Sequence, residues 1–172
     1  MGQNGGSMKF SFAVVMTLLL GTSLSACGSS HDDAAAKAEA AKVTAYCAAL
    51  KKAAPEIKAY DKEELNFRKL QSYFDVMQSL AKKSPAAVSR DWNVINFDIT
   101  EIERSSKAAN LNFVDIPKLA KGKIPKGAKP AKFDAVTFAF NYLKSVNLAT
   151  ATTNIADNAA KVCKVDLTPN SA

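Results

Sequence analysis

The sequence predicts an all-α protein, a small antiparallel bundle of four to five helices with one disulfide and an N-terminal lipid anchor. Three observations predict the helices. Apolar residues recur at intervals of three and four in several stretches. No stretch alternates between apolar and polar residues as a half-buried strand does. Pro55, Ser84-Pro85 and Pro130 fall between the periodic stretches, and the short turns at Pro55 and Ser84 make neighbouring helices antiparallel.

The first two helices are defined by a proline and by a capping pattern. We expect the first helix to end at Ala54, because Pro55 cannot donate a backbone hydrogen bond. Asp61 and Glu64 are spaced like a capping box and predict the start of the second helix. The apolar faces comprise Val43, Tyr46, Cys47, Leu50 and Ala54 in the first helix, and Leu70, Tyr73, Phe74, Met77, Leu80 and Ala81 in the second.

The remaining helices follow Ser84-Pro85, which predicts a third helix with serine as its cap and proline in its first turn. Between Asn110 and Lys129 the periodicity disappears, although four apolar residues there are expected to return to the core. A fourth helix is expected from Pro130 and a fifth from about Leu148. The apolar face of the third helix comprises Val88, Trp92, Ile95, Ile99 and Ile102, and the four apolar residues of the segment that follows it are Phe113, Val114, Ile116 and Leu119. The fourth helix carries Phe133, Val136, Phe140 and Leu143, and the fifth carries Ile155, Ala159, Val162 and Cys163.

An export signal precedes the bundle. Met8-Lys9 is followed by an apolar run from Phe10 to Leu20, which is too short to span a membrane. The run leads to Leu24-Ser25-Ala26-Cys27, which matches the bacterial lipobox. In that motif the cysteine thiol carries a diacylglycerol group and becomes the first residue of the mature chain. The sequence therefore predicts an extracytoplasmic protein anchored to the cell membrane through Cys27; the alternative is an ordinary signal with a chance cysteine.

The chain divides accordingly into four parts. Residues 1–26 form the lipoprotein signal peptide, and residues 1–7 resemble a non-native leader or an upstream start. Residues 27–36 comprise the lipidated cysteine and a polar tether. The helical bundle domain covers 37–167, and 168–172 form a C-terminal tail.

Cys47 and Cys163 remain as a pair once Cys27 is assigned to the lipid. Disulfides form and persist in exported proteins, so we expect these two residues to be bridged. Two buried free thiols or half of a metal site are the alternatives. A metal site lacks ligands, because His31, in the tether, is the one histidine.

The residues required for common catalytic sites are missing from the sequence. One histidine cannot form a zinc-protease motif, and His31 is poorly placed to activate a serine or cysteine nucleophile. The acidic residues Asp98, Glu101 and Glu103 could serve as paired carboxylates. Their neighbours Arg104 and Lys107 favour a solvated, ion-paired helix face instead. We therefore expect no enzyme, no metal and no cofactor.

The most distinctive surface feature is a lysine-rich segment. Six lysines fall between residues 118 and 132 without an acidic residue among them: Lys118, Lys121, Lys123, Lys126, Lys129 and Lys132. Without these six and Lys9, the 23 basic residues fall to 16, which equals the 16 acidic residues. The segment predicts contact with a polyanion, either anionic lipid, a wall polymer or an acidic protein. Nucleic acid is not expected, since no aromatic residues accompany the lysines. The alternative is a surface loop kept soluble by lysine.

A second candidate surface lies on the fourth helix. Phe138 and Tyr142 are four residues apart and off the face that holds Phe133 and Phe140. Exposed, they would form a small apolar patch; buried, they would pack a second face of a central helix.

Short motifs along the domain are similar to those of small, uncharacterised helical lipoproteins of high-GC Gram-positive bacteria. They are Tyr46-Cys47-Ala48-Ala49-Leu50, Ser84-Pro85-Ala86 with Asp91-Trp92, the loop from Gly122 to Lys132, and Cys163-Lys164-Val165-Asp166-Leu167. The resemblance implies a lipidated Cys27 and a Cys47–Cys163 bridge, and no activity.

Three functions are compatible with these features. The first is a non-catalytic, lipid-anchored helical protein that binds a cell-envelope component or a partner protein through the lysine-rich segment. The second is an extracytoplasmic binding protein for a small apolar ligand or lipid. The third is a phage or prophage lipoprotein that excludes superinfecting phage.

Overall fold

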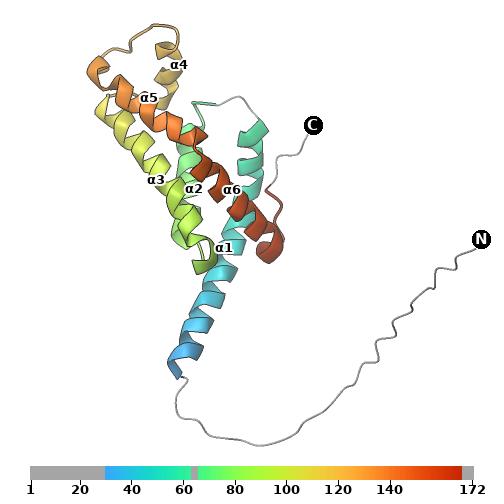
Figure 1. Ribbon diagram of the computed structural model, residues 1–172. Helices are drawn as coiled ribbons and strands as arrows, with labels where there is room; N and C mark the ends of the chain where they lie inside the picture. Colours follow the sequence, from blue (N-terminus) through green and yellow to red (C-terminus); the bar gives the residue numbers. More distant parts are fainter. Residues whose placement is uncertain (1–29, 63–65, 168–172) are drawn as a thin grey trace, which may run out of the picture.

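The computed structural model describes residues 30–62 and 66–167, and the side chains of 33–60 and 66–167. These residues form six α-helices and no strand, which confirms the all-α class (Figure 1). The helices are α1 (Ser30–Lys62), α2 (Leu70–Lys83), α3 (Ala86–Ala108), α4 (Ile116–Leu119), α5 (Phe133–Asn141) and α6 (Val146–Asn158). Since α4 is a single turn, five longer helices remain. The expected signal peptide (residues 1–26), the expected lipidation site Cys27 and the expected tail 168–172 lie outside the described residues.

Helix α3 is the centre of the bundle. Helices α1, α2 and α3 alternate in direction, and α5 and α6 follow one another across α3 (Figure 1). The expected α3 seam is confirmed, because Val88, Trp92, Ile95, Ile99 and Ile102 are all buried. The largest side chains that are almost fully buried are Trp92, Tyr46, Leu50, Leu70 and Ile102. The core therefore lies between α1, α2 and α3 and is covered by α6.

The first helix does not end at Ala54, as the sequence predicted, but continues through Pro55 to Lys62. A proline inside a helix removes one backbone hydrogen bond and typically costs about 3 kcal/mol. Contacts beyond the proline offset this: Ile57 is buried, and the Tyr60 ring stacks on Tyr73 with centroids 4.1 Å apart. Lys58 Nζ also lies 3.0 Å from Asp166 Oδ2. Tertiary packing therefore outweighs the local helix-breaking signal.

The start of α1 also differs from the expected boundary. The helix begins at Ser30, within residues 27–36 that we expected to be a polar tether. Residues 33–38 are exposed, and this part of α1 extends beyond the other helices (Figure 1).

The predicted caps of the second and third helices are wrong. Asp61 lies within α1, Glu64 lies outside the described residues, and α2 begins only at Leu70 without a side-chain cap. Ser84 does not cap α3; its hydroxyl donates to the Ala81 carbonyl instead. The backbone N–H of Ala86 donates to Glu39 Oε1 of α1 at 2.7 Å. A carboxylate from another helix therefore caps α3, where it also complements the helix dipole.

The segment from Asn110 to Lys132 contains two Schellman motifs. In the first, Asn110 has φ 52°, its N–H donates to Lys107 O, and the Leu111 N–H donates to Ser106 O. In the second, Gly122 has φ 71°, and the N–H groups of Gly122 and Lys123 donate to the carbonyls of Leu119 and Lys118. Both satisfy carbonyls at a helix end with a residue that tolerates a left-handed conformation.

The same segment carries a second, smaller core. Ala109, Leu111 and Val136 are buried in it, and Leu119, Ala128, Phe133 and Phe140 pack against them. Of the four apolar residues expected to return to the core, Phe113 is buried, and Ile116 and Leu119 are half-buried. Val114 is 47% exposed, so that expectation is wrong.

The Cys47–Cys163 disulfide is present and joins α1 to the helical turn Ala159–Cys163 that extends α6. After this turn the chain reverses at Lys164, which has φ 56°, and Val165 is buried against α1 and its neighbours. The first and last parts of the described chain are therefore tied together.

Candidate functional site

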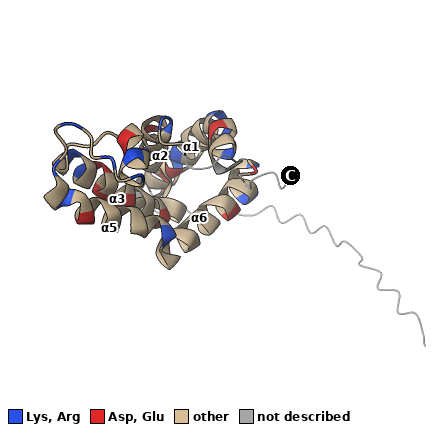
Figure 2. Cartoon of the chain, turned by 90° about the horizontal axis from the view of Figure 1, so that it is seen from above, with Lys and Arg blue, Asp and Glu red and all other residues tan. Residues whose placement is uncertain are grey.

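The six lysines of the lysine-rich segment all have exposed side chains. These lysines lie within residues 118–132, the lysine loop. Figure 2 shows this loop, with its blue segments, at the end of the molecule formed by α5 and the C-terminal end of α3. Lys118 pairs with Asp115 at 2.6 Å, which holds the pKa of the Asp115 carboxyl below its ordinary value. No described carboxylate pairs with the other five lysines. The loop therefore carries a largely uncompensated positive charge.

The lysine loop is folded against the end of α3. The backbone N–H of Lys129 donates to Ala109 O at 2.9 Å, and Asn110 Nδ2 donates to Gly127 O at 2.8 Å. Gly127 has φ 83°, a conformation that favours glycine, and an added Cβ would lie 3.2 Å from Asn110 Nδ2. Together with the small core beneath, these bonds give the lysines a fixed framework.

A cleft of about 490 Å³ adjoins the lysine loop through Asn110. Arg68 and Lys107 line it together with Gln71, Glu103 and Asn112. Its two cations extend the basic surface beyond the loop. The sequence did not indicate this, because Arg68 lies 50 residues before Lys118 and only the packing of α2 on α3 brings it there.

The lysine loop lies at the end of the bundle opposite the N-terminus of α1 (Figure 1). At 1.5 Å per residue, the 33 residues of α1 are about 50 Å long. Only Gly28 and Ser29 separate Cys27 from the start of α1, and such a segment reaches about 10 Å at most. A lipid on Cys27 would therefore lie near one end of the bundle, with the lysine loop at the other.

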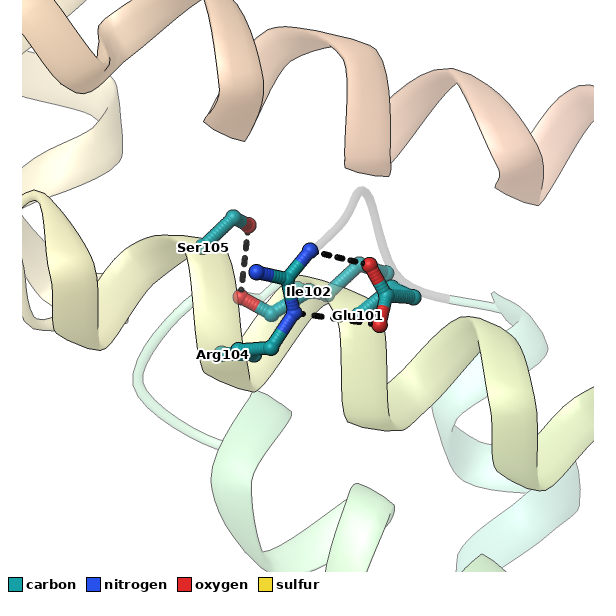
Figure 3. A network of polar contacts seen from close by, with 4 residues as sticks. All are labelled: Glu101, Ile102, Arg104 and Ser105. Carbon is teal, nitrogen blue, oxygen red and sulfur yellow. Dashed lines mark hydrogen bonds and ion pairs between the residues drawn. The ribbon is translucent and has the colours of Figure 1, made fainter.

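The three acidic residues of α3 that the sequence offered as paired carboxylates, Asp98, Glu101 and Glu103, have different environments. Glu101 and Arg104 form a bidentate ion pair on the helix surface, as expected (Figure 3). This hydrogen bonding lowers the pKa of the Glu101 carboxyl. The carboxylate of Glu103 accepts hydrogen bonds from Gln71 at 2.8 Å and from Gln78 at 3.0 Å on α2. Glu101 therefore pairs within α3, and Glu103 joins α3 to α2.

Asp98 contradicts the expectation of a solvated face. Its side chain is buried at 4% exposure, and its Oδ2 atom has no hydrogen-bond partner. Burial raises the pKa of the Asp98 carboxyl above its ordinary value. The periodicity missed this residue, because α3 is covered on one side by α2 and on another by α5 and α6.

The aromatic residues of α5 and of the turn Tyr142–Lys144 that follows it fall into a core-packed pair and a more exposed pair. Phe133 and Phe140 pack on the small core, whereas Phe138 is 63% exposed and Tyr142 is half-buried. A separate, mainly apolar cleft of about 490 Å³ lies between α1, α2, α3 and α6. Its walls include Ile57, Met77, Trp92, Ile155 and Leu167. The best candidate for an apolar ligand is therefore this cleft and not the face of α5.

Within the described part of the chain, no three histidine, cysteine or carboxylate side chains lie close enough together to hold a metal ion. None of the helices in residues 30–62 and 66–167 is both long and apolar enough to cross a lipid bilayer. Comparisons with protein-family models, with curated proteins and with solved structures find no match.

Proposed function

We propose that this protein is a non-catalytic, lipid-anchored adaptor on the outer face of the cell membrane that binds an anionic envelope polymer or an acidic partner through the lysine loop. The observation that supports it is a set of six exposed lysines on a folded loop with one ion pair among them. A preformed loop loses less conformational entropy on binding than a flexible one does. The lipid on Cys27 remains part of this proposal.

The position of the lysine loop favours a polymer or protein partner over the headgroups of the anchoring membrane. With α1 upright, the loop would stand about 50 Å from the anchor, far beyond the Debye length of about 8 Å at physiological salt. The headgroups would attract the loop only if the whole bundle lay on its side.

The experiment compares two variants of the full chain in a non-ionic detergent. The loop variant changes all six loop lysines to glutamine. The matched control changes six exposed lysines elsewhere to glutamine, namely Lys37, Lys42, Lys51, Lys52, Lys82 and Lys83. Both variants lose the same charge. Binding to poly(glycerol phosphate), and separately to nanodiscs containing anionic lipid, is measured across a salt series.

The proposal predicts salt-sensitive binding of the polymer that falls at least tenfold in the loop variant and less than threefold in the control. Equal losses in both variants would show that net charge alone drives binding. Absence of binding by the unaltered chain to either ligand would make the lysine loop a solvated surface element. Stronger binding to nanodiscs than to the polymer would favour a bundle lying on the membrane.

A second candidate function, carriage of a small apolar ligand, is favoured by the apolar cleft between α1, α2, α3 and α6. A cleft of about 490 Å³ is within the usual range for small-molecule sites. This binding should persist at high salt and in the loop variant, and mass spectrometry of the purified chain should detect a bound lipid. Exclusion of superinfecting phage remains a third proposal, tested by plaque counts on cells that express the protein.

A further inference from the structure

Asp98 lies at a cleft of about 430 Å³ that is separate from the lysine loop. The cleft is formed by α3, by the short helical turn Tyr142–Lys144 and by the start of α6. Asp98 is 4% exposed and its Oδ2 atom has no hydrogen-bond partner. No described residue forms an ion pair with it. A carboxylate in this position lacks the compensation that buried charges normally have in a folded protein.

Two aromatic side chains, Phe97 and Tyr142, line the same cleft, and Phe138 packs beside Tyr142 outside the lining. The Tyr142 ring meets Phe97 edge to face with centroids 6.2 Å apart, and Phe138 in the same way at 5.2 Å. Phe97 is 55% exposed and Phe138 is 63% exposed. Large aromatic side chains are rarely this exposed without a partner, and edge-to-face packing leaves ring faces open to a ligand.

A buried carboxylate beside open aromatic rings complements an organic cation. The rings attract a cation through their quadrupoles, and the carboxylate supplies the opposite charge. We propose that this cleft binds an organic ammonium ion, with Asp98 as the counter-charge and Phe97 and Tyr142 as the aromatic wall. The site does not depend on the proposed function, since the lysine loop is a different surface with the opposite preference.

Two positive features face the same cleft and limit the affinity. Arg90 lines its far end and lies eight residues before Asp98, about 12 Å along α3. The N-terminus of α6 also points a positive dipole end at the cleft, although the Ser145 hydroxyl accepts the Leu148 N–H and occupies one free donor there. Arg90 is exposed, so water and salt screen it more than they screen the buried Asp98.

The test uses the full chain in a neutral maltoside detergent, titrated with choline and with its neutral isostere 3,3-dimethylbutan-1-ol while amide resonances are followed by NMR. Choline should shift resonances of α3 and of residues 142–147, and the isostere should bind at least tenfold more weakly. Asp98→Asn should weaken choline binding at least tenfold. Phe97→Ala removes an exposed ring that lines the cleft without opening the core, and should weaken choline binding about threefold or more.

Arg90→Gln should strengthen choline binding about twofold, because it removes an opposing charge. The loop variant should bind choline as the unaltered chain does. N-acetyl-lysine amide, titrated in parallel, distinguishes a site for primary ammonium groups from one for quaternary ammonium groups. Equal affinity for choline and the isostere, or an unaffected Asp98→Asn variant that folds normally, would overturn the proposal, as would the absence of any shift at 50-fold excess of choline.

Discussion

Trp92 Nε1 donates a hydrogen bond to the Tyr46 hydroxyl at 2.9 Å and joins α3 to α1 inside the core. The two rings also meet edge to face, with centroids 6.3 Å apart. Because Tyr46 is 0% exposed and Trp92 is 1% exposed, solvent water does not reach these groups to replace the hydrogen bond. Burial raises the pKa of the Tyr46 hydroxyl above its ordinary value, so the proton that it carries at neutral pH is held more tightly.

Tyr46→Phe should lower the free energy of unfolding by about 1–3 kcal/mol, because the Trp92 N–H is left buried without an acceptor. Urea unfolding followed by fluorescence of Trp92, the single tryptophan, measures this directly. Trp92→Phe and the double variant Tyr46→Phe/Trp92→Phe, followed by circular dichroism, complete a double-mutant cycle that separates the hydrogen bond from the loss of ring volume. An unchanged unfolding midpoint in Tyr46→Phe would show that the bond adds nothing to stability.

Reduction of the Cys47–Cys163 disulfide should destabilise the domain. The bridge spans 116 positions of sequence, for which the chain-entropy model gives about 4–5 kcal/mol. We expect the urea midpoint to fall clearly in dithiothreitol, and a Cys47→Ala/Cys163→Ala variant to show the same midpoint with and without it. If the unaltered chain unfolds at the same urea concentration in both redox states, packing alone holds α1 to the end of α6.

Pro55→Ala should stabilise the protein. Alanine restores a backbone N–H in the interior of α1, and helix propensity favours it by up to about 3 kcal/mol at an exposed site. The side chain of Pro55 is exposed, so the change opens no cavity. A rise in the unfolding midpoint is expected, whereas a fall would mean that the helix needs the proline geometry to bring Tyr60 onto Tyr73.

Asp98→Asn should raise the free energy of unfolding at pH 7 by about 1 kcal/mol or more, since the neutral side chain is easier to bury. Burial raises the pKa of Asp98 in the folded state above its unfolded value, so the folded protein binds the proton more tightly. The contribution of Asp98 to the free energy of unfolding is fully present below the pKa that Asp98 has in the unfolded state. It is lost as the pH rises through the higher pKa of the folded state.

The stability difference between Asp98→Asn and the unaltered chain should therefore widen as pH rises from about 3 toward 7. Chemical unfolding of both proteins at several pH values measures this difference. Ion pairs such as Glu101–Arg104 contribute equally to both and cancel. A difference independent of pH would mean that Asp98 is not the group that titrates.

The all-α class, the α3 seam from Val88 to Ile102 and the pairing of Cys47 with Cys163 could all be predicted from the sequence. These follow from local periodicity and from a count of cysteines, which need no knowledge of neighbours in space. The sequence also showed the cluster of lysines. It did not show that the loop that carries them is folded against the end of α3.

The tertiary structure alone decided the features that depend on contacts distant in sequence. Ile57 and Tyr60 keep α1 helical past Pro55, and Glu39 caps α3 in place of Ser84. Asp98 is buried because α5 and α6 cover a face of α3 that local charge pattern marks as solvated. Each local signal is worth at most a few kcal/mol. Packing energies of the same size can reverse it, and they cannot be read from the sequence because they depend on residues that are distant in the chain.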